Sequence, residues 1–271
     1  MSKSNESSSS LRSMFAAIVI PVAFVVAFVI YAFVLGDPSH FQGGNPENNP
    51  VNGDIMGIIH KGGIIVPILI GMLLLVVTFS LERLFTVAKA KGKGSVEGFV
   101  KNIRGFLASG DINAAAAACD KQQGSVANVI RSGLGKYKEM ENEHGLDKER
   151  KLLAIQKEIE EATQLELPML EKNLVVISTI ASIATLMGLL GTVLGMIKAF
   201  QALAQAGAPD AIKLSTGISE ALINTAFGIG TSALAIIMYN YFTSKIDGLT
   251  YGIDEAGFSI VNTFAANYKE K

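Results

Sequence analysis

The 271-residue sequence has no tryptophan, a single cysteine and few charged residues. Charged side chains make up 17% of the chain and hydrophobic ones 49%, whereas an average soluble domain is about a quarter charged. The formal net charge of −1 provides no basic field of the kind that attracts nucleic acid. One cysteine, Cys119, cannot form an intramolecular disulfide. The composition therefore argues against a nucleic-acid-binding or disulfide-stabilised protein and favours a lipid environment.

Sequence signatures of metal, nucleotide and covalent chemistry are also missing. The three histidines and the cysteine are scattered and form no cluster with metal-ligand spacing (His40, His60, His144 and Cys119). Neither G-x-x-x-x-G-K-[ST] nor G-x-G-x-x-G occurs, and no nucleophile–base set or paired carboxylates can be assembled. We therefore expect no catalytic residues, no metal, no cofactor and no enzyme activity.

Four long stretches contain no more than one charged residue each. They are residues 13–36, 62–81, 173–197 and 214–244, and their one charge is Glu220. A helix needs about 20 apolar residues to cross the hydrocarbon core. The alternatives are buried helices of a large soluble core and, for the first stretch, a cleaved signal peptide. Four coincident runs disfavour the first alternative, and the length of the first run without an A-x-A site disfavours the second. We predict an all-α membrane protein with four transmembrane helices.

The distribution of lysine and arginine predicts the orientation of these spans. Both residue types concentrate between the second and third spans and are sparse in the two short loops, so the long segment and both tails should be cytoplasmic. The expected organisation is a cytoplasmic tail (1–12), an extra N-terminal membrane helix (13–36), a periplasmic loop (37–61), a second membrane helix (62–85), a helical cytoplasmic domain (86–172), a third membrane helix (173–200), a periplasmic loop (201–211), a fourth membrane helix (212–244) and a cytoplasmic C-terminal helix (245–271).

The segment between the second and third spans has the pattern of several helices. Apolar residues recur with a 3.6-residue period from Val96 to Leu107, and Asp111 is placed as the N-cap of the helix that follows. A long, highly charged helix should begin near Asp147 and continue through Pro168 into the third span. The first outer loop, residues 37–54, has no apolar period and is expected to be an irregular connector.

The last two spans carry polar stripes. In the fourth span, Glu220, Asn224 and Thr225 fall on one side of a helical wheel, and Thr192 belongs to a second stripe in the third span. The simplest interpretation is helix packing, which we adopt for the small residues Gly188, Gly195 and Gly228. A carboxylate in a membrane span is costly and marks a functional site, unless Glu220 is close enough to the outer surface to be wet. The stripes therefore predict a water-filled or protonatable path.

Three segments in this order resemble the signature of the MotA/TolQ/ExbB proton channel family, closest to ExbB. They are Ile180–Phe200 (IASIATLMGLLGTVLGMIKAF), Gly217–Gly230 (GISEALINTAFGIG) and the Tyr239-Asn240 pair. The resemblance covers roughly residues 62–245. The chain departs from the family pattern at Asn224, where a small apolar residue is usual, and in its extra N-terminal span.

The resemblance implies a biopolymer transport protein of the inner (cytoplasmic) membrane. It implies a homo-oligomer, most simply a pentamer, whose two long helices line a central pore that holds two copies of an ExbD/TolR-like single-span subunit. A TonB-like energy transducer would be driven by the proton motive force. Thr192, Thr225, Glu220 and Asn224 would then belong to the proton pathway. The alternatives are a TolQ-like role in envelope maintenance, a secondary transporter with its own substrate, and a structural scaffold.

Overall fold

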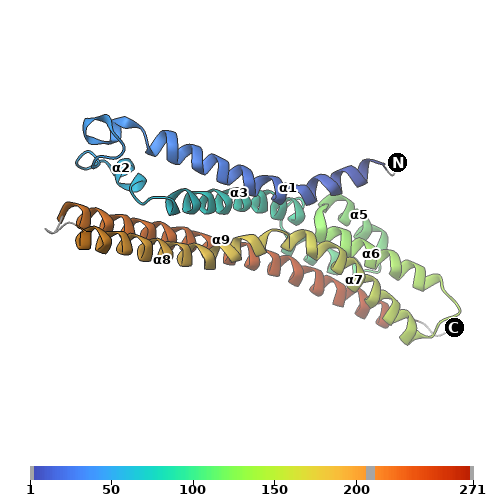
Figure 1. Cartoon of the computed structure of the whole chain (residues 1–271). Coiled ribbons are helices and arrows are strands. Elements are labelled where there is room, and N and C mark those ends of the chain that lie inside the picture. Colours follow the sequence, from blue (N-terminus) through green and yellow to red (C-terminus); the bar gives the residue numbers. More distant parts are fainter. Residues whose placement is uncertain (1–2, 206–210, 269–271) are drawn as a thin grey trace. The chain divides into compact units, whose positions relative to one another are not determined.

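The computed structural model describes residues 3–205 and 211–268, and the regular structure within them is helical (Figure 1). The elements are α1 (Lys3–Val29), η1 (Ile30–Leu35), η2 (Pro38–His40), η3 (Gln42–Gly44), α2 (Ile55–His60), α3 (Ile65–Lys91), α4 (Val96–Ala108), α5 (Ile112–Gln122), α6 (Gly124–Asn142), α7 (Lys148–Glu171), α8 (Leu174–Gln205) and α9 (Ala211–Asn267). This confirms the all-α fold class. Of the predicted loop 201–211, residues 206–210 lie outside the described residues, as do residues 1–2 and 269–271 of the two tails.

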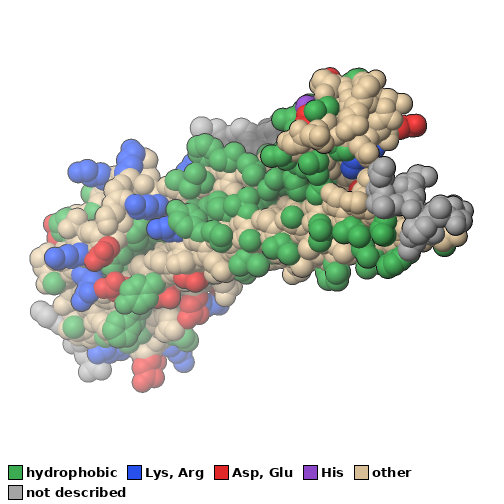
Figure 2. All heavy atoms as spheres, turned by 90° about the vertical axis from the view of Figure 1, so that its left-hand side faces the viewer, with side chains coloured by type: hydrophobic (Ala, Val, Ile, Leu, Met, Phe, Trp, Pro, Cys, Tyr) green, Lys and Arg blue, Asp and Glu red, His purple; other side chains and the backbone are tan. Residues whose placement is uncertain are grey.

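Four segments of the described chain are long and apolar enough to cross a membrane, as predicted. They are Phe15–Leu35, Ile65–Ala108, Leu174–Gln201 and Leu214–Asn267. The chain divides into two compact units. We call Met1–Leu81 with Asn173–Tyr239 the apolar unit, and Glu82–Lys172 with Asn240–Lys271 the charged unit. On the face drawn in Figure 2, hydrophobic side chains gather on one part of the surface and most Lys, Arg, Asp and Glu side chains on another.

In the apolar unit, α1 packs against α3. The ring of Phe24 lies over Gly71, where a Cβ would approach the ring carbons to 2.6 Å. At the start of η1, Tyr31 stacks on His60 with ring centroids 4.5 Å apart, and its hydroxyl donates to the His60 carbonyl at 3.1 Å. Burial beside this ring lowers the pKa of His60, since it disfavours the charged imidazolium. These contacts fasten the extra N-terminal helix to the beginning of α3.

The segment between η1 and α2 is more ordered than the irregular connector that the sequence predicted. Phe41 and Pro50 form an isolated antiparallel bridge. The Asp54 carboxylate accepts a hydrogen bond from His40 Nδ1 at 2.8 Å and caps α2 through the backbone N–H groups of Met56 and Gly57. Local side-chain hydrogen bonds, rather than an apolar stripe, therefore organise this loop, which is why hydrophobic periodicity gave no signal for it.

The charged unit is built like a soluble helical domain. Side chains of Ser95, Asp111 and Asp147 cap α4, α5 and α7, which confirms the N-cap predicted at Asp111. The predicted apolar stripe of α4 is confirmed as well, with Phe99, Val100, Ile103 and Leu107 buried. Cys119 is also buried, and burial raises the pKa of its thiol to about 11. The cysteine is thus a packing residue with little thiolate at neutral pH.

One predicted connection is wrong: α7 does not continue into α8. The chain leaves the helix between Glu171 and Leu174, because Lys172 has an extended ψ of 137° and Asn173 has a φ of +67°. Asparagine adopts this left-handed conformation more readily than most residues and often ends helices in this way. The helix does continue through Pro168, as predicted, and ends three residues later at Glu171.

Arg83 supports the end of α7 in the charged unit. Its side chain is among the largest fully buried ones, with 1% exposure. The guanidinium donates to the carbonyls of Met169 and Leu170 at 3.1 and 2.9 Å and pairs with Glu82 at 2.5 Å. The last carbonyls of a helix have no partner within it, so Arg83 satisfies two of them while its own charge is balanced.

Candidate functional site

The two threonines predicted to line the path are in direct contact. Thr192 of α8 and Thr225 of α9 are half-buried, and their Oγ1 atoms hydrogen-bond to each other. Thr192 Oγ1 also lies 3.2 Å from the Ala221 carbonyl, and Thr225 Oγ1 lies 3.5 Å from the Gly188 carbonyl. A hydroxyl has one proton but two lone pairs. The hydroxyl protons point at the other hydroxyl or at carbonyls. The two oxygens still have lone pairs that can accept a hydrogen bond from a further donor.

The close approach of α8 and α9 produces this contact. A Cβ on Gly188 would lie 2.9 Å from the Asn224 carbonyl oxygen, and one on Gly228 would lie 2.6 Å from that of Ala184. Gly195 faces Ala221, and a Cβ on Gly195 would lie 3.0 Å from Ala221 Cβ. Such small-residue contacts allow membrane helices to pack backbone against backbone. The structure thus places all three predicted packing glycines where α8 and α9 meet.

The depth of the threonine pair can be estimated from the helix ends. At 1.5 Å per residue, Thr192 lies about 20 Å from the end of α8 at Gln205, and Thr225 about 21 Å from the start of α9 at Ala211. Glu220 lies about 13 Å from that start by the same measure. The hydrocarbon core is about 30 Å thick. The membrane-spanning segments themselves end at Gln201 and begin at Leu214, about 14 Å from Thr192 and about 17 Å from Thr225. The threonine contact is therefore near mid-membrane depth when Gln201 and Leu214 lie at one membrane surface.

Glu220 and Asn224 do not join the threonine contact but line a cavity of about 150 Å³ in the apolar unit. We call it the Glu220 cavity. Its walls include Gly62 before α3, Gly191, Leu194 and Lys198 of α8, and Glu220 and Asn224 of α9. The predicted polar arc of the fourth span thus separates into a hydroxyl side that contacts α8 and a carboxylate–amide side at this cavity.

Asn224 connects α9 to the segment before α3. Its side chain is 2% exposed, and Nδ2 donates to the Gly62 carbonyl at 2.9 Å. Sequence reasoning missed Gly62 and Lys198 as members of this site. The two consecutive glycines after Lys61 and a lysine inside an apolar helix were the available signals, but their proximity to Glu220 depends on tertiary packing.

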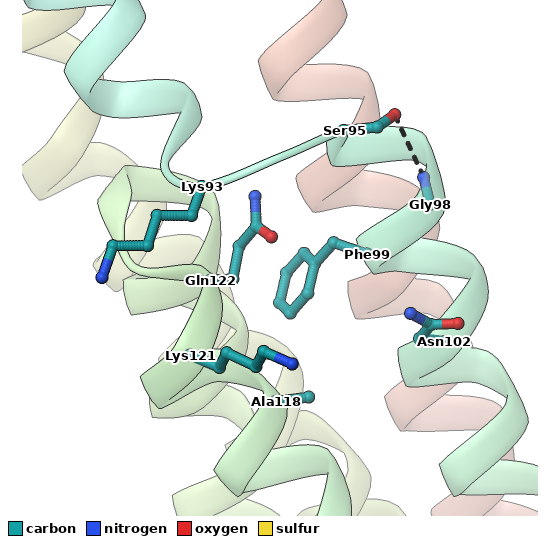
Figure 3. Close-up of a pocket in the computed structure, with 8 residues that line it drawn as sticks. All are labelled: Lys93, Ser95, Gly98, Phe99, Asn102, Ala118, Lys121 and Gln122. Atoms are coloured by element: carbon teal, nitrogen blue, oxygen red, sulfur yellow. Dashed lines mark hydrogen bonds between the residues drawn. The ribbon is translucent and has the colours of Figure 1, made fainter.

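A second hollow lies in the charged unit and has a volume of about 350 Å³ (Figure 3). It lies between the start of α4, where Ser95 Oγ accepts a hydrogen bond from Gly98 N at 3.3 Å, and the end of α5 with Lys121. Phe99 turns its ring into the hollow, whereas the Lys93 side chain points away from that ring. These lining groups hold no acid–base pair, and we assign them no chemistry.

Comparison with known proteins gives a consistent result. Residues 122–255 match the MotA/TolQ/ExbB proton channel family. The Tol-Pal system protein TolQ of Pseudomonas aeruginosa is 29% identical over 124 residues, which are 46% of this chain and 54% of that protein. The biopolymer transport protein ExbB of Helicobacter pylori is 40% identical over 81 residues, 30% of this chain and 56% of that protein. The ExbB of Aquifex aeolicus is 36% identical over 77 residues, 28% and 52% of the two chains.

The chain spans about half the length of these curated relatives. The matched residues contain α6 to α8 and most of α9. The threonine contact, Glu220 and Asn224 all lie within them, as do the glycines that bring α8 and α9 together. Through this segment, the chain belongs to the MotA/TolQ/ExbB proton channel family.

Proposed function

We propose that the chain is the proton-channel subunit of an ExbB-type motor, which couples the proton motive force to TonB-dependent transport across the outer membrane. Family membership and the four apolar helices place it in the inner membrane as a multi-pass protein. The orientation that fits its lysines and arginines has the charged unit in the cytoplasm and residues 37–61 outside. A membrane-impermeant thiol reagent should then reach a cysteine placed at Asn48 in spheroplasts, but not one placed at Lys121.

The threonine contact is the observation that carries this proposal. Two adjacent hydroxyls at mid-membrane depth can donate a hydrogen bond to a carboxylate or accept one from its protonated form. A single-span partner of the ExbD/TolR type would present its aspartate to this contact. Glu220, about one and a half turns nearer the start of α9 than Thr225, would serve the outer part of the proton path.

The partners follow from the same reasoning. A mid-membrane carboxylate facing lipid is unfavourable by about 2–3 kcal/mol, so Glu220 should face protein or water. A ring of chains, most simply five, around two copies of the single-span subunit would provide both. A TonB-like protein would be driven by the proton flow through this complex. Native mass spectrometry of the co-expressed complex should detect the ring; a monomer alone in mild detergent would contradict it.

A TolQ-like role in envelope maintenance is the second candidate, because some of the similar proteins carry that name. Complementation distinguishes the two roles. A strain lacking its ExbB should regain TonB-dependent uptake when it expresses this chain with its single-span partner, whereas restored envelope integrity in a strain lacking TolQ would favour the second role.

Substitution of the two threonines tests the mechanism. Thr192→Val and Thr225→Val keep the side-chain shape and remove the hydroxyl. Each should leave the complex assembled but abolish or strongly reduce proton-driven uptake, while Thr225→Ser, which restores the hydroxyl, should retain it. If both valine variants assembled and kept full activity, the hydroxyls would be packing groups and the proposal would be wrong.

A further inference from the structure

The Glu220 cavity contains a buried polar atom whose hydrogen bonding is incomplete. Asn224 uses Nδ2 to bind the Gly62 carbonyl, but its Oδ1 is buried without a hydrogen-bond partner among the described residues. Leaving a buried acceptor unpaired costs about 1–3 kcal/mol. Native structures usually avoid this cost with a bound water, provided that there is room and that further polar groups are near.

The cavity has that room because three of the residues that line it, Gly62, Gly191 and Gly195, have no side chain. A Cβ on Gly191 would lie 2.5 Å from Asn224 Cβ, and one on Gly62 would lie 3.2 Å from Asn224 Oδ1. The volume of about 150 Å³ would hold about five waters at the liquid density of about 30 Å³ each. Gly62 and Gly191 therefore keep open the space around the amide.

The cavity also contains opposite charges. Lys198 and Glu220 both line it, and no direct ion pair joins them in the described structure. The position of a Cβ on Gly63 lies 3.6 Å from Lys198 Nζ, so the ammonium is beside the residues that precede α3. Two charged groups that share a small cavity without direct contact are best satisfied by water between them.

We propose that the Glu220 cavity is a water-filled access site within a single chain, in which Asn224 Oδ1 anchors water, Glu220 exchanges a proton with it, and Lys198 repels metal cations. In the exchange, a hydronium ion relayed along the cavity waters gives its proton to a Glu220 carboxylate oxygen and becomes water, and the proton returns by the same route. The Lys198 ammonium repels every cation that enters the cavity, but a proton can bond covalently to a Glu220 oxygen and neutralise its charge, which a hydrated metal cation cannot do. The proton role rests on the proposed function; the hydration and charge of the cavity do not.

Alkylation of introduced cysteines tests the access site without any motor assay. Ile65 lines the cavity and is 6% exposed, whereas Val66, the next residue of α3, is 0% exposed and does not line it. Cysteines placed at these two positions, in a Cys119→Ser background, differ in contact with the cavity but not in depth. In native membrane vesicles, iodoacetate should alkylate Ile65→Cys and leave Val66→Cys unmodified, as read by mass spectrometry. Equal labelling of the two would show that the reagent does not enter through the cavity, and no labelling at Ile65→Cys would show a dry packing void; either result would overturn the proposal.

The role of Lys198 is tested in the Ile65→Cys chain with two small reagents of opposite charge. Iodoacetate should be favoured over 2-bromoethylammonium, and Lys198→Gln should lower the ratio of the two rates by about tenfold, the lower end of the effect of charge in a cleft. Lys245→Gln is the matched control. Lys245 is on α9 and does not line the cavity, so removing its charge should leave the ratio unchanged. An unchanged ratio in Lys198→Gln would remove Lys198 from the proposal.

These outcomes separate the two proposals. A chain that labels as expected but supports no proton-driven uptake with any partner would contradict the proposed function and leave the access site in place. A chain that supports uptake but shows no selective labelling at Ile65→Cys would contradict the access site and leave the proposed function in place.

Discussion

The apolar unit and the charged unit satisfy their polar groups in opposite ways. In the charged unit, helix ends are capped by side chains such as Ser95 and Asp147 at the surface, and the core is apolar. In the apolar unit, hydrophobic side chains cover the outside, and polar groups such as Thr192 and Asn224 bond to neighbouring helices. The difference follows from the solvent, because lipid offers no hydrogen bonds and water offers many. A polar residue inside the apolar unit therefore carries more information about function than one in the charged unit.

The largest effect on stability is expected at Arg83, whose charge is buried in the charged unit although the core there is otherwise mainly apolar. Arg83→Met should destabilise the protein by about 3 kcal/mol, because it leaves Glu82 without this ion pair and provides no replacement donor to the carbonyls at the end of α7. Arg104→Met is the matched control, since the Arg104–Glu255 pair is largely exposed (57% and 35%) and should contribute no more than about 1 kcal/mol. Thermal unfolding in detergent measures both, and equal losses would contradict the distinction.

In the apolar unit, the expected effect depends on which glycine is changed. A Cβ on Gly228 would lie 2.6 Å from the Ala184 carbonyl oxygen, whereas nothing lies within 4 Å of one on Gly230. Gly228→Ala should therefore cost about 1–3 kcal/mol by overpacking, and it should separate Thr192 from Thr225. Gly230→Ala should be neutral or slightly stabilising, because alanine favours the helix by about 1 kcal/mol. A tolerated Gly228→Ala would show that α8 and α9 can move apart without loss.

A smaller effect is expected at the helix caps of the charged unit. Asp111 accepts a hydrogen bond from Ala114 N at 2.8 Å at the start of α5. Asp111→Ala should cost about 1 kcal/mol, and Asp111→Asn, which keeps an acceptor, should recover most of it. Denaturation of the full chain, followed by circular dichroism, measures the difference. Equal losses for the two variants would assign the effect to charge and not to capping.

The smallest effect concerns pH and the outer loop. Hydrogen bonds from His40 and from the Gly57 backbone hold the pKa of Asp54 below its ordinary value of 3.8. A carboxyl group whose folded pKa is lowered stabilises the loop above its ordinary pKa, and that contribution is lost as the pH falls through the folded pKa. Protease cleavage within residues 41–50 should therefore increase only below about pH 4, in line with ordinary aspartate titration. Asp54→Asn should remove this dependence; if it persists, another group controls the loop.

The comparison of the units also explains what could be predicted from the sequence. Apolar runs gave the four spans, and local caps such as Asp111 gave the helices of the charged unit, because both signals are contained in neighbouring residues. The bond between Asn224 and Gly62 joins residues 162 positions apart and has no local signature. Arg83 follows the second apolar stretch, and its burial against α7 became visible only in the fold. The break at Asn173 was missed because a single asparagine between two helical patterns is a weak sign of a helix end.

The attachment of α1 has a consequence for what the rest of the apolar unit needs from this helix. The helix lies outside the residues that match the family, and its described contacts are mainly with α3 and the neighbouring His60. The exception is Phe227 of α9, which packs against the cluster formed by Ala27, Leu35, Val66 and Ile70. Neither Thr192 nor Thr225 depends on α1 for its hydrogen bonds. Loss of α1 would therefore leave the hydrogen bonds of the threonine contact in place, although it would uncover Phe227 on α9.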